Sequence, residues 1–389
     1  MTIDEQLLAW APEFSAWRRD FHAHPELGYQ EHRTAALVAE RLAAFGLEVT
    51  TGVGGTGVVG TLRAGSGNRA IALRADMDAL PIEEAGDAPW RSTAPGTMHA
   101  CGHDGHTTML LAAARYLAAT RRFSGTIHFI FQPAEEGGAG ARAMLEDGLL
   151  ERFPFDSVFG AHNDPLLPAG VVSASAGTVN AASDTLRIRL TGKGGHAARP
   201  HQAIDPIVAG AQIVVGLQSL VARRVAPLDS AVVSVCTFHA GSANNVIPEV
   251  ATLSGTVRTL MPHVQDQMAR DIPGLVAELA AAAGVAAEVG YERGYPPVVN
   301  DAGAAASFAE AARGVVGAAQ VRTTMPASMG GEDFAFYALE RPGCFFRIGQ
   351  ADGERGSVPL HHPRYDFNDA IIPLGAALFA AIAARELPA

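Results

Sequence analysis

Segments with the composition of buried β-strands alternate with segments of helical periodicity in the first half of this 389-residue chain. Residues 69–75 (RAIALRA) and 125–131 (GTIHFIF) are short apolar runs of the strand type. Helical patterns follow them at 106–122 and 138–150. This alternation predicts an α/β domain with a largely parallel sheet, in which ligands bind in the loops after the strands.

The order of predicted elements changes near residue 180. Four strand-like segments and two helical segments follow in the order βαββαβ: 185–191, 203–224, 231–239, 251–259, 263–283 and 286–292. This order is that of a ferredoxin-like α+β fold. The chain then returns to the first pattern, so we expect a catalytic domain of residues 1–180 and 295–389, interrupted by a smaller insert of residues 181–294.

Composition excludes several classes of protein. Lys and Arg number 29 and Asp and Glu 40, a formal net charge of −11, which disfavours a nucleic-acid partner. The three cysteines are too few for a disulfide scaffold, and we expect Cys236 and Cys344 to be buried small hydrophobes. No signal peptide is apparent, and no apolar run approaches a membrane span; we read 371–384 as a buried C-terminal helix. These features predict a cytoplasmic protein with no membrane partner.

The segment TMHACGHDGH (97–106) presents the first candidate metal ligands. Cys101 and His103 are separated by one residue, so an extended backbone would point both side chains to one face. A thiolate and an imidazole together favour zinc or a neighbouring transition ion over magnesium or calcium. The alternative is a surface loop with several histidines, and we leave His99 and His106 as structural residues.

Two adjacent carboxylates follow the next predicted strand, in FQPAEEGG (131–138). One of Glu135 and Glu136 is suited to bind a cation, while the other takes a proton from a bound water. The alternative is a solvated acidic pair that stabilises the start of a helix.

Histidines follow in two further loops, FGAHNDP (159–165) and VPLHHPRYDF (358–367). A lone histidine is usually structural, but these loops, like the two earlier ones, lie at the ends of α/β strands. The candidate ligands are then Cys101, His103, Glu135 or Glu136, His162, and His361 or His362. One catalytic zinc needs three protein ligands, so five with a spare carboxylate fit two ions roughly 3.5–4 Å apart that share a water.

Eight motifs in one order resemble the two-metal amidohydrolases and exopeptidases of the aminoacylase and carboxypeptidase G type, closest to the hippurate hydrolase and indole-acetyl-amino-acid hydrolase branch. They cover nearly the whole chain: RRDFHAHPELGYQE (18–31), LRADMDALP (73–81), MHACGHDGHTTM (98–109), FQPAEEGGAGA (131–141), GKGGHAARPH (192–201), NNVIPEVATLSGTVR (244–258), SMGGEDFAFY (328–337) and LHHPRYDFND (360–369).

The resemblance implies roles for individual residues of the catalytic domain. The implied metal ligands are Cys101, His103, Glu136, His162 and His361, with Cys101 bridging two divalent ions (Zn, Mn, Co or Ni) in each subunit. Glu135 would be the general base. Asp76 stands where the peptidase branches have a ligand histidine, and Asp78 would orient a ligand rather than bind the metal. The family pattern Leu-His-x-Pro selects His361 over His362.

The resemblance also assigns residues of the insert and of a late loop. His196 would reach a neighbouring subunit's active site and stabilise the oxyanion. Asn245 and Arg258 match positions that hold the substrate's carboxylate, a task suited to the planar guanidinium group. Gly330 and Gly331 would let substrate pass close to the backbone. A strand-face arginine in solvent and ordinary turn glycines are the alternatives.

The residues and the resemblance together predict a metal-dependent hydrolase that cleaves N-acyl amino acids to a carboxylic acid and an amino acid. The expected assembly is a homodimer or a dimer of dimers, with the small-molecule substrate as the other partner. A dipeptidase or aminopeptidase on the same framework is the nearer alternative; it would need an acidic partner for the substrate amine, and none is obvious. A hydrolase with Cys101 as its nucleophile is a more distant alternative, because it leaves the two glutamates and three histidines without a purpose.

Overall fold

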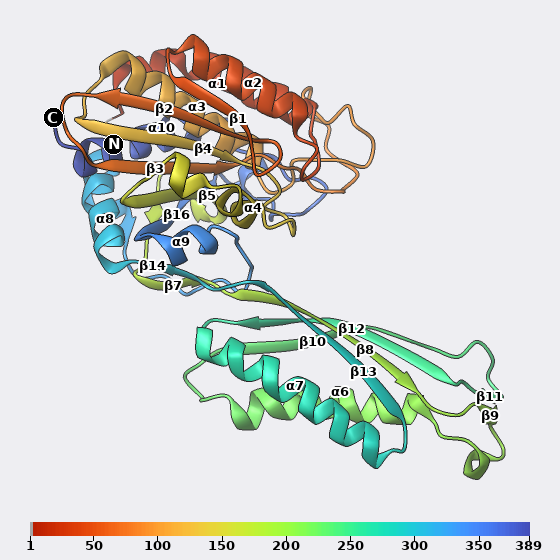
Figure 1. Ribbon diagram of the computed structural model, residues 1–389. Helices are drawn as coiled ribbons and strands as arrows, with labels where there is room; N and C mark the ends of the chain where they lie inside the picture. Colours follow the sequence, from red (N-terminus) through yellow and green to blue (C-terminus); the bar gives the residue numbers. More distant parts are fainter. Residues whose placement is uncertain (1–2) are drawn as a thin grey trace. The chain divides into compact units, whose positions relative to one another are not determined.

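The structure is a computed structural model that describes residues 3–389. The chain divides into two compact units (Figure 1). The first runs to Gly177 and continues with Val299–Pro326 and Asp333–Ala389. The second contains Thr178–Val298 and Ala327–Glu332, so it groups a short segment of the late Gly-rich loop with the middle of the chain. Both boundaries near residues 178 and 298 lie in strands that pair with each other, β7 (Gly177–Asn180) and β14 (Val298–Asn300).

A mixed sheet forms the centre of the first unit. Its strands among the described residues are β1 (Glu48–Val53), β2 (Gly57–Ala64), β3 (Ala70–Asp76), β4 (Gly125–Gln132), β5 (Ser157–Pro168), β6 (Val172–Ser173), β15 (Val321–Arg322) and β16 (Gly343–Ala351). Their order across the sheet is β1–β2–β4–β3–β5–β16–β6–β15. Neighbours from β4 to β16 are parallel, which confirms the predicted α/β class, whereas β1, β2 and β4 pair antiparallel.

Helices cover this sheet: α1 (Glu5–Ala23), α2 (His32–Ala44), α3 (His103–Thr120), α4 (Gly140–Glu146), α5 (Leu149–Arg152), α8 (Ala302–Val316), α9 (Ala335–Glu340) and α10 (Ile372–Glu386). As predicted, α10 is a buried C-terminal helix, and it packs on α3 and α8. Gly375 of α10 lies so close to α3 that a Cβ there would collide with the side chain of Met109. Residues 138–150, predicted as one helix, form two, because Gly148 has a φ of +79° between α4 and α5.

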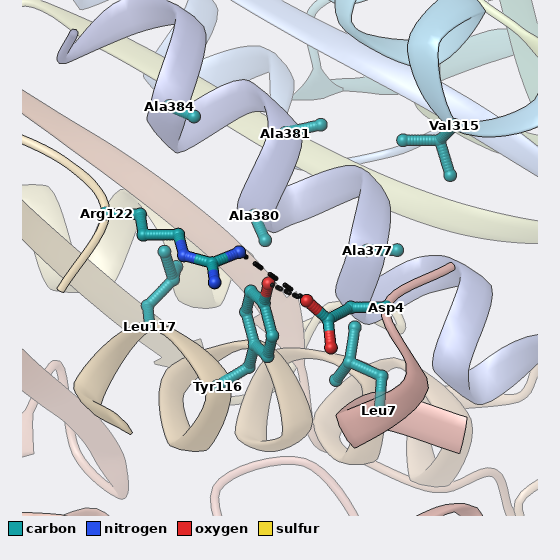
Figure 2. Close-up of a pocket in the computed structure, with 10 residues that line it drawn as sticks. All are labelled: Asp4, Leu7, Tyr116, Leu117, Arg122, Val315, Ala377, Ala380, Ala381 and Ala384. Carbon is teal, nitrogen blue, oxygen red and sulfur yellow. Dashed lines mark hydrogen bonds and ion pairs between the residues drawn. The ribbon is translucent and has the colours of Figure 1, made fainter. Parts of the chain in front are cut away.

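The start of α1 is attached to α3 at a surface pocket of about 320 Å³ (Figure 2). Asp4 accepts a hydrogen bond from the Tyr116 hydroxyl at 2.8 Å and lies 3.6 Å from the Arg122 guanidinium. The rest of the lining is apolar, with four alanines from α10. No candidate ligand lines this pocket, so these contacts serve the packing of the three helices.

The second unit has the predicted ferredoxin-like order. It contains β8 (Ala182–Thr191), α6 (Pro206–Arg224), β10 (Ala231–Ala240), β12 (Val250–Thr259), α7 (Pro262–Ala282) and β13 (Ala286–Tyr295). The strands form an antiparallel sheet in the order β10–β12–β8–β13. Two short strands, β9 (Gly195–His196) and β11 (Val246–Ile247), pair beyond one end of this sheet (Figure 1).

Two sequence-based expectations about apolar residues are wrong. The expectation that no apolar run approaches a membrane span fails at α6, the one helix of the described residues that is long and apolar enough to cross a membrane. Its buried face (Ala209, Ile213 and Leu217 among others) packs in the core of the second unit. Cys236 is exposed, although it lies in an apolar strand. The pairing of β10 with β12 shifts register between Val235 and Thr237, and this bulge breaks the alternation that predicted burial. Cys344 is buried, as predicted.

Candidate metal centre

The four segments predicted to carry metal ligands follow, or lie in, neighbouring parallel strands of the first unit. The loop 133–139, which carries Glu135 and Glu136, follows β4, and the loop 358–367 follows β16. His162 lies within β5, and Cys101 precedes α3. Carboxyl ends of parallel strands meet at one edge of a sheet, so segments far apart in sequence converge there.

Cys101 and His103 meet by a different geometry from the extended backbone predicted for them. His103 is the first residue of α3, and Gly102 before it has a φ of +94°. A Cβ on Gly102 would also lie 2.6 Å from Asn163 Oδ1. Glycine is therefore needed both for the left-handed turn and for the close approach of β5. His162 also differs from prediction, because it lies within β5, which continues to Pro168 alongside β16, rather than in a loop after the strand.

Two groups of candidate ligand atoms share one thiol. Cys101, His103 and His162 each place a ligand atom within 4.8 Å of the others, and so do Cys101, Glu136 and His361. The Cys101 sulfur lies 3.5 Å from His162 Nε2. His361 Nε2 lies 3.1 Å from Glu136 Oε1. Five donors arranged as two triplets around one sulfur match what two ions with a bridging thiolate require.

His361, rather than its neighbour, belongs to this cluster. Its main-chain N–H donates to Ala100 O at 2.8 Å, beside Cys101, and its φ is +65°. His362 instead accepts the Arg364 N–H at its own Nδ1, within a turn. The geometry thus separates the two histidines in the way that the family pattern implied.

The hydrogen bonds of the His103 and His162 rings are those expected of metal ligands. His103 Nε2 is buried and has no hydrogen-bond partner among the described residues, while its Nδ1 lies 3.2 Å from Asp78 Oδ1. His162 Nδ1 lies 2.7 Å from the main-chain oxygen of Asn163. Each ring therefore uses one nitrogen for an orienting hydrogen bond and directs the other into the cluster, as metal-binding histidines do.

Charges around the cluster favour a cation. Burial lowers the pKa of His103, but Asp76 and Asp78 outweigh it and raise this pKa to about 10. Burial raises the pKa of the Cys101 thiol, and so do the negative charges of Glu136 and Glu135. Burial lowers the pKa of His162, so this imidazole is neutral and available as a ligand. A divalent cation would compensate the excess of carboxylates and displace the protons of Cys101 and His103.

Asp78 positions both halves of the acidic pair. Its Oδ1 accepts the N–H of Glu135 at 3.0 Å, and its Oδ2 accepts the N–H of Glu136 at 2.9 Å. Glu135 is buried, and one of its carboxylate oxygens lies within 4.8 Å of a ligand atom of His103 and of Glu136. Glu136 also shares a group with Cys101 and His361, whereas the other group of Glu135 contains Glu332 and Asp333. Glu136 is therefore better placed to bind a cation together with the predicted ligands, and Glu135 to move a proton.

His106, for which the sequence indicates only a structural role, lies next to the cluster. Its Nδ1 is 2.7 Å from Asp76 Oδ1, and its Nε2 is 2.7 Å from Asn163 Oδ1. Its ring packs against His162, with 4.6 Å between the ring centroids. His106 follows His103 by three residues on one helix, so the two side chains lie on the same face, and this spacing could have indicated that His106 supports the cluster. Asp76 is in turn bound by the buried Arg74 at 2.7 Å.

Predicted substrate residues of the second unit fall into two groups. His196 lies in β9 and pairs with Val246 of β11, next to Asn245, and both predicted residues are exposed. Arg258 is half-buried in β12, and a Cβ on Gly331 would lie 3.1 Å from its guanidinium. Gly330 O accepts a hydrogen bond from Asn180 at 3.3 Å.

These two groups lie at opposite ends of one sheet. Arg258 pairs with Ser183 near the start of β8, whereas β9 begins after the end of β8 at Thr191. Eight residue steps at a strand rise of about 3.3 Å separate Ser183 from Thr191 by roughly 26 Å. One small substrate cannot contact Arg258 and His196 of the same chain across that length.

Known proteins resemble this chain over its whole length. The hippurate hydrolase of Campylobacter jejuni is 39 % identical over 387 residues, with 100 % of both chains covered. IAA-amino acid hydrolase ILR1-like 5 of Arabidopsis thaliana is 40 % identical, with 98 % of this chain and 89 % of the relative covered. A solved structure from Bacillus subtilis, described as a dinuclear metal-binding peptidase of the M20 family, has a TM-score of 0.83 and 35 % identity, with 96 % of this chain and 98 % of that chain covered.

The profile of peptidase family M20/M25/M40 matches residues 72–385. This range includes every candidate ligand, both glutamates of the acidic pair and the whole second unit. The identities above are also far beyond what a shared fold alone would give. The chain therefore belongs to peptidase family M20/M25/M40.

Proposed function

We propose that this protein is a metal-dependent hydrolase of N-acyl amino acids, which it cleaves to a carboxylic acid and an amino acid. The observation that carries the proposal is the pair of ligand triplets around Cys101, with the buried Glu135 beside them. Relatives that match the whole chain are named for the hydrolysis of hippurate and of IAA–amino acid conjugates, which are N-acyl amino acids.

Cys101, His103, Glu136, His162 and His361 are the proposed ligands of two divalent ions. When bound, such ions polarise an amide carbonyl and activate water for attack on it. Glu135 takes the proton of the attacking water and returns it to the leaving amine. Asp78 holds the Glu135 main chain while it orients His103, so the base and a ligand are fixed by the same carboxylate.

Arg258 is the proposed partner of the substrate's carboxylate. Burial lowers the pKa of Arg258, although the charge of Asp184 opposes the shift. A half-buried cation of this kind gains most from an anionic ligand. His196 is the proposed oxyanion donor, with Asn245 beside it; the exposed ring is free to face another chain. Gly331, which follows Gly330, leaves room next to Arg258.

The assembly that we propose is a homodimer with the His196 end of the second unit at the interface. The sheet has exposed edges at β10 and β13, and α6 exposes Val208 and Val215. Two-fold dimers are the commonest soluble assembly, and unpaired sheet edges are natural contact surfaces. The separation of His196 from Arg258 supports an active site that takes residues from two chains.

The alternatives receive less support from the structure. A thiol nucleophile must be accessible and ionised, but Cys101 is buried and its pKa is raised. A dipeptidase or aminopeptidase on the same framework differs only in needing an anionic group for the substrate's amine.

A substrate panel tests the proposal. Acetyl, benzoyl, long-chain and indole-acetyl amino acids, together with dipeptides that have a free amine, are assayed with Mn, Co, Ni and Zn. We expect turnover of at least one N-acyl amino acid that a chelator abolishes. Turnover confined to the dipeptides would favour the peptidase alternative, and turnover that persists in chelator would favour the thiol.

A further inference from the structure

The motif HPELGYQE (24–31) contains no candidate metal ligand, yet it contacts both ends of the loop that carries the base. We call residues 133–139 the base loop. Glu31 Oε1 accepts the N–H of Ala134 at 2.8 Å, at the start of this loop. The Tyr29 hydroxyl donates to the main-chain oxygen of Gly138 at 2.7 Å, near its end. Glu135 lies between these two attachment points.

The base loop has a backbone that alanine rarely adopts. Ala134 has a φ of +51° and Ala139 a φ of +55°, and Tyr29 itself has a φ of +62°. Non-glycine residues with positive φ persist only where surrounding contacts enforce them, and such residues gather at functional sites. The hydrogen bond donated by Tyr29 and the one accepted by Glu31 are contacts that can enforce this backbone.

Neighbouring groups contact both side chains, although the Tyr29 residue is 40 % exposed. The Tyr29 ring lies between two glycines: a Cβ on Gly55 would be 3.2 Å from it, and a Cβ on Gly138 would be 3.1 Å from it. Glu31 is buried, and its Oε2 accepts a hydrogen bond from the Thr56 hydroxyl at 2.5 Å. Each hydrogen bond therefore ties the base loop to a neighbouring segment of the chain.

We propose that Tyr29 and Glu31 are positioning residues for the reaction: they hold the base loop in its strained backbone, and this places the Glu135 carboxylate beside the ligands. The inference rests on the proposed role of Glu135 as the general base. Asp78 binds the loop at the N–H groups of Glu135 and Glu136, and the 24–31 motif binds it at Ala134 and Gly138. Without the second attachment, relaxation toward negative φ would displace Glu135.

Tyr29→Phe is the sharpest test, because it removes only the hydroxyl of a partly exposed ring. Tyr116→Phe is the matched control, since its hydroxyl makes one hydrogen bond to Asp4 away from the cluster. We expect Tyr29→Phe to lower kcat about 2- to 10-fold, the effect of one lost hydrogen bond, with KM and metal content unchanged. Equal kcat values for the two variants would overturn the proposal.

A double-mutant cycle shows whether Tyr29 acts through the base. In a Glu135→Gln background, Tyr29→Phe should cause no further loss of the residual rate. The same fold-loss of kcat in both backgrounds would show that Tyr29 does not act through Glu135.

Variants of Glu31 test the other attachment point. Glu31→Gln keeps an oxygen for the Ala134 amide and should retain near wild-type kcat, whereas Glu31→Ala should lower kcat more than Tyr29→Phe does.

Hydrogen exchange separates this inference from the proposed function. Amides of residues 134–139 should exchange faster in Tyr29→Phe than in wild type or Tyr116→Phe, in protein loaded with the same metal. Failure of wild-type protein to cleave any N-acyl amino acid would refute the proposed function, and exchange would still decide whether the base loop is restrained. Unchanged exchange in Tyr29→Phe would refute the restraint itself.

Discussion

Asp78 Oδ1 lies 3.2 Å from His103 Nδ1, and the same carboxylate accepts the main-chain N–H groups of Glu135 and Glu136. One side chain therefore connects a candidate ligand on α3 to the acidic pair after β4. A displacement of Asp78 would move both His103 and the acidic pair, so the geometry of the ligand and the geometry of the base depend on each other.

Replacing Asp78 by Asn should weaken metal binding and catalysis together. The amide is uncharged, so it supports His103 less well as a ligand, and one of the two loop amides loses its acceptor. Loss of an orienting carboxylate typically costs about 10–100-fold in metal affinity. Competition with a chelator measures the affinity. Asp156→Asn, which alters a carboxylate that accepts the Ala70 N–H at the start of β3, is the control and should bind metal like wild type.

The two neighbouring glutamates should give different phenotypes. Glu135→Gln should retain its metal and lose activity by about 10²–10⁴-fold or more, because a positioned general base contributes that range. Glu136→Gln should lose metal content instead, since Glu136 shares a group of ligand atoms with Cys101 and His361. Elemental analysis beside steady-state kinetics distinguishes them, and the reverse pattern would exchange the two assignments.

Cys101 should be required for metal, while Cys236 should be dispensable. Cys101 belongs to both ligand triplets, so Cys101→Ala should lose metal and turnover together. Cys236 is exposed in β10 of the second unit, and a thiol reagent should modify it without loss of activity. Mass spectrometry after alkylation of the metal-loaded protein identifies the labelled thiol. Full activity in the metal-free protein would refute the metal assignment.

Much of this architecture could be predicted from the sequence, because strand composition, helical periodicity and the βαββαβ order are local patterns. Local patterns failed where one residue changed the backbone: Gly102 turns the Cys101–His103 pair, and the bulge at Cys236 exposes it. The contacts of Asp78 could not be predicted, since they join residues 25 and 57 positions apart. The restraint by Tyr29 and Glu31 joins residues more than 100 positions apart. It also depends on positive φ angles at Ala134 and Ala139, which the presence of alanine in a sequence does not indicate.

His128 should make the fold sensitive to acid. Burial, and secondarily the charge of Arg63, lowers the pKa of His128 to about 4, against 6.5 for an ordinary histidine. The unfolded chain therefore binds a proton as pH falls below 6.5 while the folded chain does not, so stability falls with pH until about pH 4. This group alone should cost about 2–3 kcal/mol of unfolding free energy at pH 4.5.

His128→Gln isolates that contribution. Gln removes the titration and still accepts the hydrogen bond available from Thr61, which lies 2.9 Å from His128 Nδ1. Metal ligands are identical in the two proteins, so acid effects on the metal cancel in their difference. In denaturant unfolding from pH 7.5 to 4.5, the unfolding free energy of the variant should rise relative to that of wild type by the same amount. Parallel pH dependences of the two unfolding free energies would contradict the prediction.

His196 should act in the active site of the neighbouring chain. Because His196 and Arg258 lie at opposite ends of one sheet, a site that uses both must take them from two chains. A His196→Ala chain and a Glu135→Gln chain, each nearly inactive alone, are mixed under conditions of subunit exchange. In each heterodimer one composite site carries both defects and the other carries neither. Half of the dimers are heterodimers, so about a quarter of all sites should regain activity, an expectation that follows from two-fold symmetry. No recovery despite demonstrated exchange would place His196 in its own chain's site or outside the mechanism.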